Sequence, residues 1–121
     1  MEELKPLLSK IKKVPEVVAV YLFGSHARGE ARETSDIDIC IITKDIDFER
    51  EAEVANWAPP NVDVSFFKRM SLPFRFRVFK EGKELYVRDE SLLGRIKFRT
   101  VKEYLDFQPV FEKMCEAALR P

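Results

Sequence analysis

Three aspartates have the residue type and spacing most suited to chemistry in this chain. Asp36 and Asp38 open the apolar segment DIDICIIT, and Asp63 lies within a later one, NVDVSFF. Side chains two residues apart point to the same face of a β-strand, so the first two carboxylates start about 6.5–7 Å apart at the backbone and can converge on one or two ions. Unpaired, their charges would repel each other and resist burial. A hard divalent cation such as Mg²⁺, which takes oxygen ligands, would remove that conflict.

The Asp-Ile-Asp pattern also has a plain structural interpretation, in which it opens an edge strand with both carboxylates in solvent. A glycine–serine pair favours the functional interpretation. Gly24 and Ser25 follow the apolar segment 17–23, where a strand-to-helix turn leaves room for a ligand, and the N–H groups of the next helix could bind phosphate. Ser25 adds a hydroxyl donor, and Arg28, about one helical turn further on, could reach a phosphate oxygen. Taken alone, such a pair is usually only a turn, and such an arginine is usually a surface charge.

The spacing of these residues couples the two candidate sites. Ten residues lie between Ser25, at the exit of the first strand, and Asp36, at the entrance of the second. If these strands run antiparallel side by side, exit and entrance share one end of the sheet, and the phosphate-binding turn faces the carboxylates across a small cleft. Alternation places Asp63 on one face of the third strand with Ser65 and Phe67, so it can supply a third carboxylate.

The rest of the sequence indicates the elements that must position these residues. The predicted strands cover residues 17–23, 36–43, 61–67 and 83–87. The predicted helices cover residues 2–13, 26–30 as one or two turns, 47–57 with Asp47 as N-cap, and 90–121 with a break near Pro109. Residues 71–80 alternate like a strand, but Ser71 as N-cap, Pro73 near the start and Gly82 at the end favour a helix. We expect one two-layer α+β domain over 1–121, with its core in 1–87 and C-terminal helices in 88–121.

Composition argues against several broad classes of protein. The chain has 121 residues, and its 21 Lys and Arg balance 21 Asp and Glu, so bulk electrostatic binding of nucleic acid is not expected. The longest apolar run, 17–23, is far shorter than the roughly 20 residues of a membrane helix, and the N-terminus does not look like a secretory signal. Cys40 and Cys115 give neither a disulfide framework nor a zinc spacing, so a cytoplasmic location is expected.

The segment GSHARGEARETSDIDICII, followed by VDVSFF, resembles the DNA polymerase beta-type nucleotidyltransferase superfamily, and most closely its minimal nucleotidyltransferases (MNT). The family pattern is Gly-Ser, ten residues, Asp-x-Asp, and a third Asp on a later strand. It is matched here by Gly24, Ser25, Asp36, Asp38 and Asp63. The resemblance is strong over residues 17–67 and looser elsewhere, and it implies a polymerase beta palm-like fold with a small mixed sheet.

The resemblance also implies a mechanism and a set of ligands. Asp36 and Asp38 would hold two Mg²⁺ ions, and Asp63 would ligate the second ion and help remove the proton of the attacking hydroxyl. ATP would be the substrate, and a backbone–hydroxyl cradle with an assisting cation would hold its outer phosphates. By this resemblance, that cradle would be formed by Gly24, Ser25 and Arg28.

Minimal family members typically work beside a small helical HEPN toxin as its antitoxin, and can transfer AMP from ATP to a tyrosine of that toxin. Little more than thirty residues follow the last predicted strand, which suggests that a partner protein or a second copy of the chain completes the cleft. Two alternatives stay open: transfer to a small molecule such as an aminoglycoside, and a binding antitoxin without catalysis. The base preference of the nucleotide and the oligomeric state also stay open.

Several other residues have weaker functional interpretations. His26 is expected to be a local polar residue near phosphate, and Cys40 and Cys115 to pack in the core. Trp57 is expected at the core or a hinge rather than stacked on a base. A basic run could be one solvated helix face or an anion or partner surface; it comprises Lys68, Arg69, Arg75, Arg77 and Lys80. A set of aromatic residues is expected to lie mostly in the core, with some in an association patch; it comprises Phe74, Phe76, Phe79, Phe98, Tyr104, Phe107 and Phe111.

Overall fold

The computed structural model describes residues 2–24, 27, 29 and 36–119, and within 110–119 it describes side chains only at 113, 116 and 117. The helices, including 3₁₀ turns labelled η, are η1 (Glu2–Leu4), α1 (Lys5–Ile11), α3 (Phe48–Asn56), η2 (Phe67–Arg69), α4 (Leu72–Glu81) and α5 (Glu90–Leu119). The strands are β1 (Val17–Phe23), β2 (Ile37–Thr43), β3 (Val62–Phe66) and β4 (Lys83–Val87). The predicted strands are therefore confirmed to within a residue at each end, and the turns predicted over 26–30 lie largely outside the described residues.

The four strands form one mixed sheet in the order β3-β2-β1-β4. β1 runs antiparallel to both β2 and β4, whereas β2 and β3 are parallel. This confirms the antiparallel pairing of the first two strands on which the sequence argument depends. The parallel step from β2 to β3 needs a crossover, and α3 provides it.

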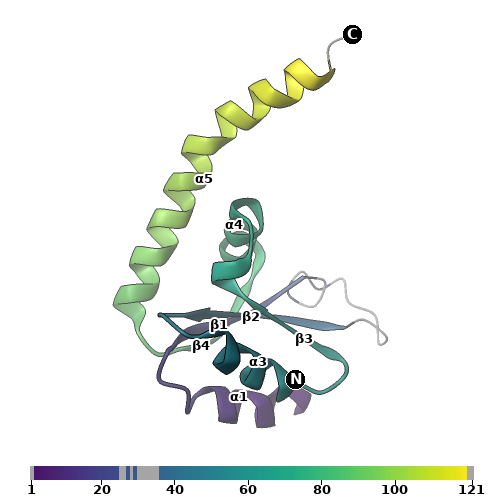
Figure 1. Ribbon diagram of the computed structural model, residues 1–121, viewed down its shortest axis with the longest axis vertical. Coiled ribbons are helices and arrows are strands. Elements are labelled where there is room, and N and C mark those ends of the chain that lie inside the picture. The colour runs from purple at the N-terminus through teal and green to yellow at the C-terminus, as the bar shows by residue number, and fades with distance from the viewer. Residues whose placement is uncertain (1, 25–26, 28, 30–35, 120–121) are drawn as a thin grey trace.

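Helices cover both faces of the sheet (Figure 1), and each face has its own core. On one face, α1 and α3 cover apolar side chains of β1, β2 and β3, with Leu7, Ile39 and Val54 among the buried residues. On the other face, α4 and α5 cover a second cluster that includes Tyr21 and Val78. The prediction of a mixed sheet with helices is confirmed, and α4 and α5 add a helical layer on the opposite face. Six of the seven residues of β1 are buried, as expected for a strand covered on both sides.

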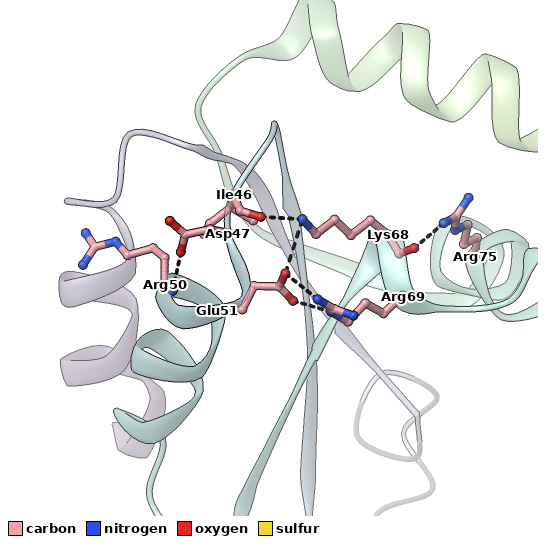
Figure 2. Close-up of polar contacts among 7 residues, drawn as sticks. All are labelled: Ile46, Asp47, Arg50, Glu51, Lys68, Arg69 and Arg75. Carbon is pink, nitrogen blue, oxygen red and sulfur yellow. Dashed lines mark hydrogen bonds and ion pairs between the residues drawn. The ribbon is translucent and has the colours of Figure 1, made fainter.

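Helix α3 is fixed by a cap at its start and by a buried carboxylate within it. The Asp47 side chain accepts a hydrogen bond from the Arg50 N–H at 2.7 Å, which confirms the predicted N-cap. Glu51 is almost fully buried and accepts two hydrogen bonds from the Arg69 guanidinium, at 2.7 and 3.1 Å (Figure 2). The Lys68 ammonium lies 3.3 Å from Glu51 and donates to the Ile46 carbonyl at 2.7 Å. These contacts tie α3 to η2 at the end of β3.

The basic run that begins at Lys68 is therefore not one solvated helix face. Lys68 and Arg69 bind Glu51, and Arg75 donates to the carbonyls of Phe67 and Lys68 at 3.0 and 2.6 Å. The η2 turn, which the sequence pattern did not predict, separates the first two cations from those on α4. Only part of the run is thus available for a role at the surface.

Residues 72–81 form the helix favoured by the flanking residues rather than the strand suggested by their alternation. Pro73 lies in the first turn, where a helix does not need its N–H. Ser71 occupies the N-cap position without a side-chain capping bond. At the other end, a Cβ on Gly82 would lie 2.2 Å from the Val78 carbonyl oxygen and 3.1 Å from that of Leu22. Glycine therefore lets the end of α4 pack closely on β1.

Helix α5 continues through Pro109, so the predicted break near this residue is wrong. Proline removes one N–H donor from a helix and strains the preceding turn. Here Leu105, whose carbonyl loses that donor, is 54 % exposed, so water can satisfy the carbonyl. The long ribbon of α5 curves away from the sheet beyond α4 (Figure 1). In the described part of the chain, no helix combines the length and the apolar character that crossing a membrane would require.

The aromatic residues are less buried than their spacing predicted. Phe79 packs in the second core, and the ring of Phe76 stacks on that of Tyr104 with centroids 4.0 Å apart. Phe74, Phe98 and Phe107 are exposed, so fewer of these aromatic residues lie in the core than expected, and these three are available for the association patch that the sequence also suggested. The side chain of Phe111 lies outside the described residues. Helical spacing alone could not distinguish a core stripe from an uncovered one, because α5 extends beyond the sheet that would bury it.

Candidate active site

The strand register brings two of the predicted carboxylates together. Asp38 on β2 pairs with Asp63 on β3, and on its other side Asp38 pairs with Phe23 on β1. Paired residues on neighbouring strands lie about 4.8 Å apart and point to the same face. The buried neighbours identify this face, because Cys40 and Phe67 belong to the core beneath α4 and α5. Asp38 and Asp63 therefore lie side by side on one face of the sheet, as the alternation predicted.

The Asp-Ile-Asp segment is on an inner strand, so the interpretation that it opens an edge strand is wrong. β2 lies between β1 and β3. Asp36 directly precedes β2 and is exposed, Asp38 is half-buried, and Asp63 is exposed. Like charges directly opposite each other on paired strands are destabilising, so Asp38 and Asp63 form a place where a cation would relieve repulsion.

Gly24 places the turn after β1 directly against the Asp38 carboxylate. Its φ of +74° is in the left-handed region, which glycine adopts without the penalty that other residues incur. A Cβ at this position would lie 2.5 Å from Oδ2 of Asp38, closer than two such atoms can approach. The backbone conformation and the space available both require glycine here. The turn that the sequence suggested for phosphate binding is therefore in contact with the predicted metal ligand.

Three of the predicted site residues fall outside the described residues. These are Ser25 and Arg28, predicted to bind phosphate, and His26, predicted to be a polar neighbour. The residues of the site that the structure does describe are Gly24, Asp36, Asp38 and Asp63.

The chemistry of this donor set suits a hard cation, although the metal site is not preformed. Among the described residues, no three His, Cys, Asp or Glu side chains are already grouped tightly enough to hold a metal ion. Mg²⁺ usually binds through one or two carboxylates together with substrate phosphates and water, rather than in a cage made wholly of protein. Asp38, with Asp63 opposite and Asp36 two residues before it, fits that mode. The remaining ligands of the ion would then come from the phosphates of the nucleotide and from water.

A small pocket adjoins Gly24. It has a volume of about 140 Å³ and is lined by Phe23 and Gly24 from the end of β1 and by Phe74, Arg77 and Glu81 from α4. Sequence reasoning did not assign the three α4 residues to the site. Their spacing of i, i+3 and i+7 places them on one face of a helix, but only the fold shows that this face meets the glycine turn.

Two other ionisable groups on this face are structural. Cys40 is fully buried, its Sγ lies 3.6 Å from Sδ of Met70, and burial raises the pKa of the thiol to about 12. Burial also raises the pKa of Tyr21 well above its usual value, and its hydroxyl donates to Glu84 at 3.0 Å. Both groups stay protonated at neutral pH, which confirms the prediction that Cys40 packs in the core. Trp57 packs against the first core beside α3, also as expected.

Comparison with known proteins identifies the family. The family description "Polymerase beta, Nucleotidyltransferase" matches residues 2–91, which include β1 to β4 and all of the predicted site residues. The chain belongs to this nucleotidyltransferase family. The resemblance to this family, which rested on Gly24, Ser25 and the three aspartates, is thereby confirmed.

Curated relatives of this nucleotidyltransferase carry related names. The protein adenylyltransferase MntA of Shewanella oneidensis is 30% identical over 102 residues, which cover 78% of this chain and 71% of MntA. A shorter segment of 45 residues is 47% identical to MJ1215 of Methanocaldococcus jannaschii, and covers 34% of this chain and 52% of that protein. The match thus spans about half the length of that relative.

Solved structures share the fold along nearly the whole chain. A chain of a toxin–antitoxin crystal structure with AMP-PNP has a TM-score of 0.77 and 22% identity, and the match covers 98% of both chains. A chain from a complex of a tri-AMPylated HEPN toxin of Shewanella oneidensis with its MNT antitoxin has a TM-score of 0.69 and 21% identity, covering 96% of this chain and 98% of that one. This nucleotidyltransferase therefore has the polymerase beta-type fold.

Proposed function

We propose that this chain is a Mg²⁺-dependent nucleotidyltransferase that transfers AMP from ATP to a tyrosine hydroxyl of a HEPN-type toxin and so acts as an antitoxin. The observation that carries the proposal is the arrangement in which Asp63 lies beside Asp38, and Asp38 lies against Gly24. The name of the Shewanella relative, a protein adenylyltransferase, supports AMP as the transferred group. The fold match to a tri-AMPylated toxin in complex with its antitoxin supports a protein acceptor.

In this proposal each residue has a defined task. Asp36 and Asp38 would hold two Mg²⁺ ions, and Asp63 would ligate one of them and draw the proton from the acceptor hydroxyl. When bound, Mg²⁺ neutralises phosphate charge and lowers the pKa of the attacking hydroxyl. The backbone at Gly24, with Ser25 and Arg28, would hold the outer phosphates so that pyrophosphate can leave. No covalent intermediate on the protein is required, which agrees with the inert, buried Cys40.

The partner surface is proposed to lie on α5. Phe98 is 71% exposed and Leu105 is 54% exposed on this helix, and Phe107 is also exposed. A shallow groove beside Phe98 is lined by further residues of the same helix, Arg95, Arg99 and Lys102 among them. An exposed strip that combines apolar and basic side chains is typical of a protein interaction site. We therefore assign the catalytic core to residues 1–87 and the partner contact to residues 88–121, in a reducing cytoplasm where ATP is available.

The test is a transfer assay with mass spectrometry of the acceptor. The purified chain is incubated with ATP and Mg²⁺ and with the protein encoded by the neighbouring gene, and the acceptor is then weighed and its modified residue mapped. The expected result is one or more AMP adducts on tyrosine that are absent with EDTA and with the double variant Asp36→Asn, Asp38→Asn.

Two other results would redirect the proposal. If the folded double variant still neutralises the partner fully, the chain acts by binding and the catalytic proposal is wrong. If an aminoglycoside accepts AMP while the protein partner does not, the reaction is retained and the acceptor is wrong. Circular dichroism of the variant provides the control for folding.

A further inference from the structure

The pocket beside Gly24 can be located relative to the carboxylates from the strand pairing. Asp63, Asp38 and Phe23 are neighbours on β3, β2 and β1, and Gly24 follows Phe23. The pocket between the end of β1 and α4 is lined by Gly24, and α4 covers the face of the sheet on which the carboxylates lie. The acid pair, the glycine turn and the pocket-lining face of α4 are therefore neighbours in that order.

This order assigns the two ends of a bound triphosphate. On the proposed function, which this inference presupposes, the α-phosphorus must lie at the carboxylates, where the hydroxyl attacks. The acceptor oxygen bonds to the α-phosphorus, the bond to the bridging oxygen of the β-phosphate breaks, and pyrophosphate leaves with that electron pair. The hydroxyl proton passes to Asp63. The β- and γ-phosphates then extend across Gly24 toward α4.

Arg77 is the cation on that face of α4. Its guanidinium lines the pocket together with Gly24, and its side chain is 55% exposed. The ion pair of Arg77 with Glu81, one turn further along the helix, is long at 3.9 Å. Arg69 and Arg75, in the same basic run, are held by bonds of 2.7 and 2.6 Å elsewhere in the fold. Arg77 is therefore placed to bind an anion with little loss of existing contacts.

The other α4 residues of the pocket are compatible with phosphate bound beside Arg77. Phe74, one turn before Arg77, is 54% exposed and forms an apolar wall beside the turn. The Glu81 carboxylate also lines the pocket, and its negative charge would keep phosphate on the Arg77 side. A planar guanidinium can donate two parallel hydrogen bonds to one phosphate, which fixes both its position and its direction.

We propose that Arg77 binds the β- and γ-phosphates of the nucleotide and stabilises the departing pyrophosphate. This assigns to α4 a substrate contact outside the glycine–serine and aspartate motif. The close packing of Gly82 on β1 holds the end of α4, and with it Arg77, near the glycine turn.

The test compares binding of a triphosphate and a monophosphate. Isothermal titration in Mg²⁺ measures AMP-PNP and AMP against the wild-type chain, Arg77→Gln, Arg77→Lys and a control on the same helix, Lys80→Ala. Loss of a charge-assisted bond predicts that Arg77→Gln weakens AMP-PNP binding by about tenfold or more while AMP binding is unchanged. Arg77→Lys should retain part of the affinity, and Lys80→Ala should match the wild type. Thermal unfolding verifies that the exposed substitutions leave the fold intact.

The outcomes separate this inference from the function on which it rests. If the wild type binds AMP-PNP and Arg77→Gln binds it equally well, the assignment of Arg77 is overturned and the proposed function stands. If Arg77→Gln weakens AMP and AMP-PNP to the same degree, Arg77 does not contact the outer phosphates and the assignment also falls. If the wild type binds no nucleotide, the proposed function fails and the assignment fails with it.

Discussion

At the scale of single residues, Gly24 links the backbone to the chemistry. Its left-handed φ and the position of Asp38 Oδ2, 2.5 Å from where a Cβ would be, are independent reasons for glycine. We predict that Gly24→Ala destabilises the chain by about 1–2 kcal/mol through backbone strain. It should also displace the Asp38 carboxylate and reduce nucleotidyl transfer strongly.

Urea unfolding and the transfer assay measure the two effects of Gly24→Ala. Gly29 is the matched control, because it too has a positive φ, of 73°, but has no atom within 4 Å of a Cβ. Gly29→Ala should therefore lose stability by a similar amount without clashing with the Asp38 carboxylate. Equal loss of transfer in both variants would contradict the role of the Gly24–Asp38 contact.

Asp63 is predicted to oppose stability while supporting catalysis. It lies opposite Asp38 across two paired strands, and like charges in that position are destabilising by roughly 0.2–1 kcal/mol. Without metal, Asp63→Asn should therefore unfold at the same or slightly higher denaturant concentration than the wild type. With Mg²⁺ and ATP, it should lose transfer by about 100-fold or more, because a proton acceptor is removed.

The control for Asp63→Asn is Glu53→Gln, which removes an exposed carboxylate on α3 and should change neither measurement. A marked loss of stability in metal-free Asp63→Asn would show that this carboxylate is structural, and the assigned role would be wrong.

At the scale of secondary-structure elements, Glu51 joins α3 to η2. Hydrogen bonds from Arg69, and then the contact with Lys68, lower the pKa of this buried carboxyl below its usual value of 4.5 (Figure 2). A carboxylate with a lowered pKa contributes stability that is fully present above pH 4.5 and is lost as the pH falls through its lower value in the folded state. Glu51 should thus be one source of acid sensitivity.

We predict that Glu51→Gln lowers the melting temperature at pH 7 and reduces the additional loss of stability between pH 5 and pH 3. Differential scanning calorimetry across that range measures both effects. Glu53→Gln is the matched control on the same helix, since Glu53 is exposed and pairs with Arg50 at the surface. An unchanged pH profile in Glu51→Gln would contradict the assignment.

The elements also show what the sequence could and could not predict. The types of neighbouring residues in the sequence were sufficient to predict β1, the Asp47 cap and α4. In α4, the positions of Pro73 and Gly82 outweighed a strand-like alternation. Neighbouring residue types were not sufficient at Pro109, because the cost of a proline within a helix depends on whether water can reach the freed carbonyl. They also failed to assign Arg77, because the residue that it faces, Gly24, is more than 50 positions away in the sequence and is brought near only by the packing of α4 on β1.

At the scale of the whole molecule, α5 extends beyond the sheet (Figure 1). Apolar side chains on this helix, Phe98 and Leu105 among them, are exposed. We predict that Phe98→Glu or Leu105→Glu prevents co-purification with the proposed partner protein and leaves AMP-PNP binding unchanged. A buried hot-spot aromatic typically contributes 2 kcal/mol or more, so the affinity should fall by about 30-fold or more.

Phe48→Glu is the control for this surface, because Phe48 is 70% exposed but lies on α3, on the opposite face of the sheet. The partner should bind this variant as tightly as the wild type. If Phe98→Glu binds the partner normally and Phe48→Glu does not, the partner contact is on the α3 face and the assignment to α5 is wrong.

The most direct test of the account is a crystal structure with AMP-PNP and Mn²⁺, whose anomalous scattering locates the metal. We predict metal density at Asp36, Asp38 and Asp63, the triphosphate crossing the turn at Gly24, and its outer phosphates near Arg77. Metal bound elsewhere, or a nucleotide on another face of the sheet, would contradict the central claim.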